Sequence, residues 1–124
     1  KGMNIYYIDG HTDDEIREIY KKKMESGDNV ILVASFGTFS TGINVKNIHN
    51  IFFTESFKSE IVIRQSIGRG LRLHKLKDKL IIIDFVDDFC WGSWKNYIFK
   101  HGLQRQEIYR EQSFSFEIKK LKFT

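Results

Sequence analysis

Apolar positions in this 124-residue chain fall into two patterns, short continuous runs and longer stretches with helical spacing. The short runs predict strands at 4–8, 30–34, 50–54 and 80–86. Helical spacing predicts helices over 12–26, around 64–72 and over 91–111, the last with a break at Gly102. A Gly/Ser/Thr-rich loop is expected at 36–44, and a closing edge strand at 113–123. Strands that alternate with helices in this order indicate an α/β domain with a mostly parallel sheet.

These elements carry specific expectations about burial and capping. The run at 30–34 is apolar at every position, which is typical of a strand buried on both faces. Residues 12–15 read Thr-Asp-Asp-Glu, a capping box in which Thr12 caps the first helix. Gly27 ends that helix, and Ser59 can cap the helix around 64–72. The apolar stripe of the first helix consists of Ile16, Ile19, Tyr20 and Met24.

The segment 64–72, Arg-Gln-Ser-Ile-Gly-Arg-Gly-Leu-Arg, carries the strongest chemical signal in the chain. Its polar helix face consists of Gln65, Gly68, Arg69 and Arg72. The positions that can pack against a core are Ile63, Ile67 and Leu71. Arginine suits a phosphate partner because its planar guanidinium donates two hydrogen bonds at once and stays charged. For the arginines and the glutamine alone, a solvated helix face is the simpler explanation. Gly68 and Gly70 favour the phosphate partner, because each costs a helix about 1 kcal/mol relative to alanine and fits a close approach to the backbone.

Two further segments follow predicted strands directly, where ligands of parallel sheets bind. Residues 34–44, Ala-Ser-Phe-Gly-Thr-Phe-Ser-Thr-Gly-Ile-Asn, offer hydroxyls and backbone N–H groups that can bind phosphate oxygens. A tight polar connection explains this segment equally well. Gly10, His11 and Thr12, with Arg17 behind them, stand at a predicted helix N-terminus, which attracts anions. Capping by Thr12 alone is the simpler interpretation there.

Taken in order, these three segments resemble the second RecA-like lobe of superfamily 2 helicases and translocases. Residues 9–24 are similar to motif IVa of that family, residues 35–44 to motif V and residues 64–72 to motif VI. Within the family, the middle segment is most similar to the UvsW type of T-even phage DNA helicase. The resemblance implies that residues 1–124 form a RecA-like (P-loop NTPase-like) three-layer α/β domain. We expect the domain to be truncated at its N-terminal end, because the strand and helix that begin such a lobe do not precede Lys1.

The resemblance also implies roles for individual residues. Arg72 would be the arginine finger at the γ-phosphate of ATP, supported by Arg69 and Gln65. The nucleotide-binding set would be Gly42, Asn44, Gln65, Gly68, Arg69 and Arg72, with Gly42 and Asn44 coupling nucleotide to nucleic acid. The contacts to the nucleic-acid backbone would come from Gly10, His11, Thr12, Ser35, Thr38 and Thr41. The chain departs from the family at Asn44, where many members have Asp, and at Phe36, where motif V often has Thr.

The implied protein is an ATP-dependent DNA helicase or translocase of recombination, replication or repair. Its partners would be branched or single-stranded DNA and the N-terminal RecA-like lobe of the same protein, with no membrane. No G-x-x-x-x-G-K-[ST] phosphate loop or D-E-x-H metal motif occurs in the chain. ATP and its Mg²⁺ ligands would therefore depend on the first lobe, and the chain alone should be inactive. The alternatives are the motor lobe of an RNA helicase, the motor lobe of a restriction or remodelling system, and a non-catalytic RecA-like binding module.

Composition adds modest constraints. The net charge of +4 is compatible with nucleic acid without requiring it. The single cysteine, Cys90, excludes an internal disulfide, fits a reducing cytoplasm and reads as a buried structural thiol. The four histidines are scattered, which argues against a metal site. There is no membrane span or signal peptide, and we expect a cytoplasmic protein, in the host cytoplasm if the gene is from a phage.

The end of the chain matches the motifs less clearly. Its aromatic and apolar residues are Trp91, Trp94, Tyr97, Ile98 and Phe99. Packing over the sheet is the simplest explanation for them, and a platform for stacking bases is the alternative. A basic terminus follows, formed by Lys119, Lys120 and Lys122. A solvated edge strand protected by lysines explains that terminus equally well.

Overall fold

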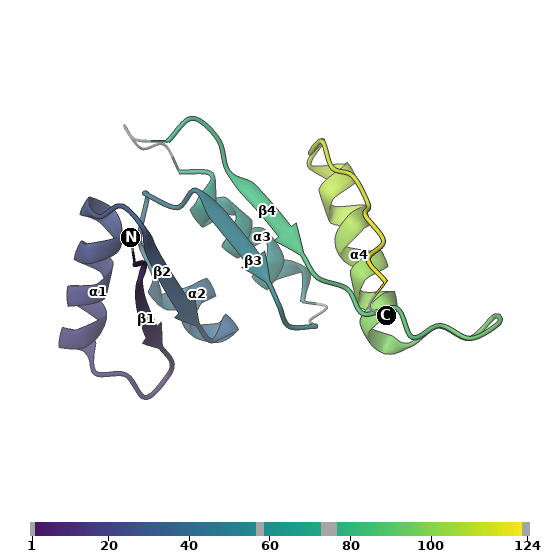
Figure 1. Ribbon diagram of the computed structural model, residues 1–124, viewed down its shortest axis with the longest axis horizontal. Coiled ribbons are helices and arrows are strands. Elements are labelled where there is room, and N and C mark those ends of the chain that lie inside the picture. The colour runs from purple at the N-terminus through teal and green to yellow at the C-terminus, as the bar shows by residue number, and fades with distance from the viewer. Residues whose placement is uncertain (1, 57–58, 73–76, 123–124) are drawn as a thin grey trace.

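The computed structural model describes residues 2–56, 59–72 and 77–122. Strands and helices alternate along the described chain, as predicted (Figure 1). Their order is β1 (Asn4–Ile8), α1 (Asp14–Ser26), β2 (Val30–Ala34), α2 (Phe36–Gly42), β3 (Asn50–Phe53), α3 (Glu60–Gly70), β4 (Ile81–Asp84) and α4 (Tyr97–Glu111). The described helices include none that is long and apolar enough to cross a bilayer.

The strands pair in parallel, which confirms the predicted strand direction. β1 pairs with β2, from Asn4 opposite Val30 to Ile8 opposite Ala34. β3 pairs with β4, from Asn50 opposite Ile81 to Phe53 opposite Asp84. Within the described residues these pairs form two separate two-stranded sheets. In Figure 1 the carboxyl ends of all four strands lie toward one edge of the molecule.

Burial alternates along the strands with a period of two, and the helices cover one face. The covered face contributes Ile8, Ile51 and Phe53 to a core that also contains Ile63 and Ile67 of α3. Apolar side chains on the opposite face are exposed, and they belong to Ile5, Tyr7, Ile31, Val33, Phe52, Ile81 and Ile83. The prediction that residues 30–34 are buried on both faces is therefore wrong for the described chain, where no layer covers the second face.

Two helices differ from their predicted apolar faces. Ile63 and Ile67 are buried as expected, but Leu71 is exposed because α3 ends at Gly70 and Leu71 is its C-cap. In α1, Tyr20 and Met24 pack against the core, as predicted. Two other members of its predicted stripe are exposed instead, Ile16 and Ile19. Both helices begin near the expected positions but bury a narrower stripe than the sequence suggested.

Several local predictions are wrong. The expected loop at 36–44 contains α2, and residues 113–122 do not pair as a strand. The N-cap of α1 is Asp13, without a side-chain cap bond, while the Thr12 hydroxyl bonds back to Asp9. Ser59 does occupy the N-cap position of α3, again without a side-chain cap bond. α4 begins only at Tyr97 and continues unbroken through Gly102.

Gly102 allows α4 to approach the segment after β4 closely. A Cβ atom at position 102 would lie 2.7 Å from both methyl groups of Val86, which is too close for a side chain to fit. The same helix is fixed by a buried arginine, Arg105, whose Nε and Nη2 donate to the two carboxylate oxygens of Asp84 at 2.8 Å each. Tyr109 donates its hydroxyl hydrogen to Asp84 Oδ2, also at 2.8 Å. Sequence reasoning did not find this network.

Candidate nucleotide and nucleic-acid interface

Arg69 ties α3 to the end of α2. Its Nε and Nη2 donate to the backbone carbonyl of Ser40 at 3.1 and 2.8 Å, and its Nη1 donates to the carbonyl of Ile43. Ser40 belongs to the last turn of α2 and Ile43 is its C-cap, where carbonyls lack partners within the helix and a positive charge is favoured. Burial, followed by the nearby charge of Arg72, lowers the pKa of Arg69. In this structure the guanidinium of Arg69 is engaged by backbone carbonyls at the end of α2.

Arg72 follows α3 in a turn and meets Asn44, a residue 28 positions earlier in the sequence. Its Nη1 donates to the Asn44 side-chain oxygen, and both side chains are exposed. Lys77 lies at the same corner, where its Nζ donates to the carbonyls of Gly70 at 2.6 Å and Lys46 at 3.0 Å. Burial lowers the pKa of Lys77. Arg72 and Lys77 thus place two positive charges at this corner, while the Glu25 carboxylate, which accepts the Lys46 N–H at 2.8 Å, adds one negative charge. The remaining positive charge favours an anion.

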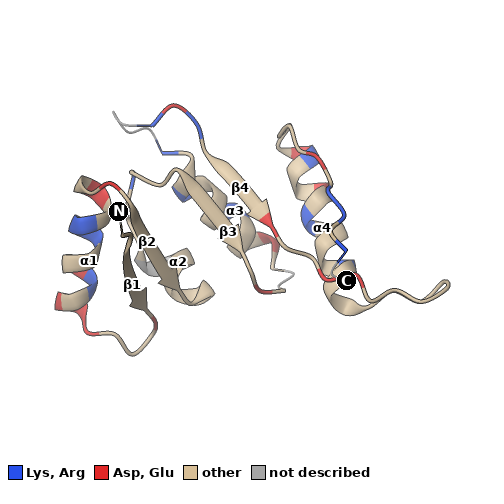
Figure 2. Cartoon of the chain, viewed as in Figure 1, with Lys and Arg blue, Asp and Glu red and all other residues tan. Residues whose placement is uncertain are grey.

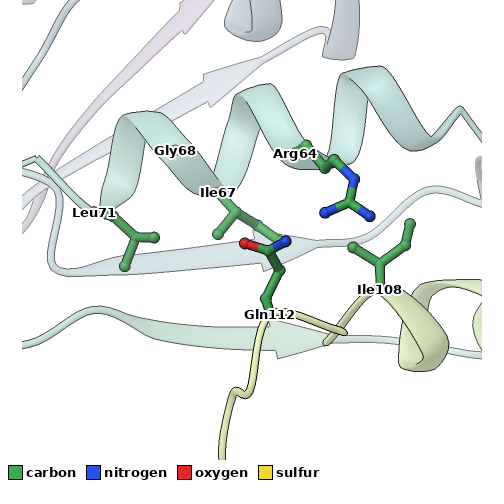
Figure 3. A pocket seen from close by; sticks show the side chains of 6 residues that line it. All are labelled: Arg64, Ile67, Gly68, Leu71, Ile108 and Gln112. Carbon is green, nitrogen blue, oxygen red and sulfur yellow. The ribbon is translucent and has the colours of Figure 1, made fainter. Parts of the chain in front are cut away.

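Gly68 and Arg69 are consecutive but face different neighbours. Gly68 lines a small hollow of about 180 Å³ between α3 and α4, together with Arg64, Ile67, Leu71, Ile108 and Gln112 (Figure 3). Arg64 closes one side of the hollow by bonding Glu111 of α4. The volume is below the roughly 300 Å³ at which small-molecule pockets begin. The hollow is therefore smaller than a typical small-molecule site, and its lining does not include Asn44 or Arg72.

The glycines of α3 have different surroundings. A Cβ atom at Gly68 would have nothing within 4 Å, whereas one at Gly70 would meet side chains of Leu80 and Ile51 at 2.6 to 2.9 Å. Gly70 is therefore required by packing inside the domain, and only Gly68 leaves room for an external group. Gln65, on the same helix, is exposed.

The turn after β1 forms a closed hydrogen-bonded unit. Asp9 accepts the His11 N–H at 2.8 Å and the Thr12 hydroxyl at 3.2 Å, and its own N–H donates to Thr12 Oγ at 2.9 Å. The His11 N–H is the main cause that lowers the pKa of the Asp9 carboxyl group. Arg17 holds the turn from behind by donating to the Asp9 carbonyl at 2.8 Å. Gly10 and His11 remain exposed, while the Thr12 hydroxyl is already engaged.

The candidates after β2 separate into surface and interior positions. Ser35 is exposed, and its hydroxyl donates to Thr38 Oγ at 2.8 Å. Thr38 is buried, so Ser35 is the member of this pair that reaches the surface. Thr41 and Gly42 belong to α2, but their side-chain positions lie outside what the structure describes.

The candidates therefore form two groups at opposite ends of the strands. Gly10, His11 and Ser35 follow β1 and β2 at their carboxyl ends, and the Ser35 N–H donates to the Ile8 carbonyl at 3.2 Å. Arg72 follows Gly70, which packs against residues at the amino ends of β3 and β4. α2 joins the two groups, because it begins beside Ser35 and ends at the carbonyls that Arg69 holds.

The aromatic residues after β4 do not pack over the sheet. Trp91, Trp94 and Tyr97 are exposed, so the packing prediction is wrong for these three, while Ile98 and Phe99 are half-buried in α4. Cys90 is half-buried rather than fully buried. The neighbouring Asp88 side chain and then burial raise the pKa of its thiol, which disfavours the reactive thiolate. Within the described ranges, no three His, Cys, Asp or Glu side chains gather as a metal site.

Comparison with known proteins gives consistent matches. The model of the helicase conserved C-terminal domain family matches residues 1–74. The chain is 38% identical to the ATP-dependent DNA helicase uvsW of enterobacteria phage T4, covering 93% of this chain and 25% of that protein. It is 36% identical to "Putative ATP-dependent helicase IRC3" of Saccharomyces cerevisiae, covering 68% of this chain and 12% of that protein. The chain thus spans at most a quarter of these curated relatives.

Solved structures give the same result. The crystal structure of T4 UvsW superposes with a TM-score of 0.66 at 36% identity, covering 90% of this chain and 24% of the solved chain. The C-terminal part of the Fun30 ATPase domain superposes with a TM-score of 0.60 at 16% identity, covering 88% of this chain and 41% of the solved chain. At that identity, the Fun30 likeness supports the fold alone.

Proposed function

The chain belongs to the helicase conserved C-terminal domain family, and from that premise we propose that it is the second motor lobe of an ATP-dependent DNA helicase of recombination, replication or repair. The RecA-like α/β fold that this family implies is confirmed, and the resemblance to the UvsW type of phage helicase is confirmed as well. The observation that carries the proposal is the pairing of Arg72 with Asn44, which joins the motif VI segment to the motif V segment at an exposed, positively charged corner.

Arg72 is the proposed arginine finger. Its exposed guanidinium, which bonds the Asn44 side-chain oxygen, would hold the γ-phosphate of ATP, and the Mg²⁺ ligands would come from the first lobe. ATP supplies the phosphoryl group for hydrolysis, and the guanidinium stabilises the negative charge that develops during its transfer. Gln65, exposed on α3, supplies an amide on the same side of the reaction. Lys77 adds positive charge to the corner, so the described residues fit a phosphate group.

Arg69 and α2 connect this corner to the nucleic acid. When Arg72 leaves Asn44, Arg69 still holds the end of α2, so α2 would shift together with α3. Because α2 begins beside Ser35, such a shift reaches the edge where Ser35, Gly10 and His11 are proposed to contact the DNA backbone. Contacts of this kind are to phosphates, so DNA binding should weaken with salt and depend little on sequence.

The test is Arg72→Ala in the full-length protein, with ATP hydrolysis measured with and without DNA. We expect kcat to fall by about 10³-fold or more, because the finger acts on the transition state, while the protein stays folded. Arg110→Ala is the matched control, since Arg110 is an exposed arginine paired with Glu107 and far from Asn44 in the chain. Normal turnover by the Arg72 variant would refute the assignment.

Nucleic acids of different type separate this proposal from its rivals. Stronger stimulation by single-stranded or branched DNA than by RNA supports a DNA helicase, and the reverse order supports an RNA helicase. No hydrolysis by a folded full-length protein under any of these conditions would favour a RecA-like binding module.

A further inference from the structure

Residues 89–97, here called the aromatic turn, lie between β4 and α4. In Figure 1 this part of the chain extends away from the other elements and reverses at its tip. The reversal is built by Trp91 and Trp94, whose backbones exchange hydrogen bonds of 3.1 and 2.9 Å. Gly92 between them adopts a left-handed φ of 57°, which glycine tolerates without strain. The aromatic turn is therefore a defined structure rather than an irregular connection.

A buried asparagine fixes the base of the aromatic turn. Asn96 donates from Nδ2 to the Asp87 carbonyl at 3.0 Å, and its Oδ1 accepts the Phe89 N–H at 3.1 Å. Asp88 accepts the Cys90 N–H at 3.1 Å. These bonds satisfy backbone groups that a loop would otherwise expose to water, and they hold the tip in one orientation. The rings are thus presented on a fixed support.

The rings themselves face solvent. The exposed fractions are 68% for Phe89, 86% for Trp91, 59% for Trp94 and 77% for Tyr97. Exposed contiguous apolar surface on a folded protein marks an interaction site. Both tryptophans of the chain are in this turn, so its composition differs from that of the rest of the surface. A flat apolar partner would cover the rings.

Lysines accompany the rings. Lys95 follows Trp94 directly, and Lys100 holds its Nζ 5.5 Å from the ring centre of Tyr97. Asp87 and Asp88 lie at the base of the turn, and the charge of Lys120 contributes to lowering the Asp88 pKa, after the hydrogen bonds from Cys90. Figure 2 shows basic residues along α4 and along the C-terminal segment that returns beside it. Two lysines therefore lie beside the rings, Lys95 within the turn and Lys100 in the first turn of α4.

We propose that the aromatic turn is a stacking platform for the bases of single-stranded DNA. Single-stranded DNA combines flat apolar faces with anionic phosphates, which matches exposed rings accompanied by Lys95 and Lys100. Duplex DNA hides its base faces inside the stack and lacks this match. In Figure 1 the turn follows the carboxyl end of β4 and extends at the end of the molecule away from β1 and β2. The inference rests on the proposed helicase function, but the turn lies beyond residues 1–74, which the family model matches.

The experiment compares three forms of the full-length protein: wild type, Trp91→Ala/Trp94→Ala, and Trp91→Phe/Trp94→Phe. Binding of a fluorescently labelled oligothymidylate is measured by anisotropy over a series of salt concentrations, with a duplex of equal length as a second probe. Stacking of one base on one ring is worth a factor of at least about five in affinity. We therefore expect the double alanine variant to bind oligothymidylate at least about 25-fold more weakly, and the double phenylalanine variant to retain most of the affinity.

Two features of the result identify stacking. The slope of affinity against salt should stay unchanged in the alanine variant, because no phosphate contact is removed, and duplex binding should also stay unchanged. Equal affinity of the alanine variant and the wild type for oligothymidylate would overturn the inference. An equal loss on duplex would overturn it too, because the lost contact would then not be to base faces.

Tryptophan fluorescence tests the same contact without relying on the alanine variant. The emission difference between wild type and the phenylalanine variant comes from Trp91 and Trp94, and oligothymidylate should quench it. An unquenched difference spectrum at saturating oligothymidylate overturns the proposal. ATP hydrolysis by the wild type, measured with the same DNA, tests the helicase assignment independently of the stacking platform. If hydrolysis is stimulated by DNA while the turn shows no stacking, only the platform is wrong.

Discussion

Replacing Asp84 by Asn should strongly destabilise the domain, because it removes the charge that neutralises Arg105. The side chain of Arg105 is 0% exposed and that of Asp84 is 14% exposed. The substitution keeps the size of the Asp84 side chain but removes the negative charge that Nε and Nη2 of the buried Arg105 contact. Breaking a buried pair in this way costs about 3–5 kcal/mol. That is a large part of the roughly 5–15 kcal/mol by which native domains are stable.

Urea unfolding followed by far-ultraviolet circular dichroism measures the effect. With a urea slope of roughly 1–3 kcal/mol/M for a domain of this size, the midpoint should fall by about 2 M. A triple substitution, Asp84→Leu with Arg105→Met and Tyr109→Phe, should recover most of the loss, because it replaces the buried ion pair by apolar groups of similar volume and also removes the hydroxyl that donates to Asp84. A midpoint shift below about 0.3 M for Asp84→Asn would show that the pair is solvated and would refute the reasoning.

Two other predictions follow from the contacts of Arg69 and Tyr109. Arg69→Ala leaves carbonyls at the end of α2 without their charged donor, so the free energy of unfolding in urea should fall by about 2–3 kcal/mol. The stimulation of ATP hydrolysis by DNA should also fall in the full-length protein. An unchanged stimulation ratio would exclude coupling through α2. Burial, and then the charge of Asp84, raise the pKa of Tyr109 far above its ordinary value. The stability that this provides is fully present below pH 10, near which the unfolded chain ionises, and is lost as pH rises further. In Tyr109→Phe, the free energy of unfolding measured by urea titration should decrease less as the pH is raised above about 10. An identical decrease in both proteins would contradict this linkage.

The strands were predictable because their signals are local. β1 and β3 lie within one residue of their predicted bounds, and alternating or continuous apolar runs need no knowledge of distant contacts. α2 was missed for the opposite reason. Its Gly/Ser/Thr-rich sequence has low helix propensity, and the helix depends on Arg69, which reaches its end from 26 residues away. The local sequence of α2 does not show that Arg69 will make this contact.

The start of α4 was misplaced because aromatic residues give the same apolar signal in a helix, a strand or an exposed turn. The residue type at Asn96 is the signal that could have found the boundary, since asparagine is a preferred N-cap residue, and it occupies that position in the structure. Gly102 was taken as a break, yet it is the point where Val86 comes too close for any side chain. The sequence shows that a glycine is present, and only packing shows why.

For the candidate site, the sequence by itself determined which residue types are available and in what order, and this order was sufficient to identify the family. It also determined that Arg69 and Arg72 lie close to the same helix end, because a spacing of three residues is a local property; α3 itself ends at Gly70 and Arg72 follows it. The tertiary structure decided that Arg69 holds α2 while Arg72 pairs with Asn44, and that Thr38 is buried while Ser35 is exposed. It also decided that the tryptophans face solvent. These outcomes depend on which surfaces meet across the folded chain, and burial and pairing between distant residues are not encoded in any local pattern.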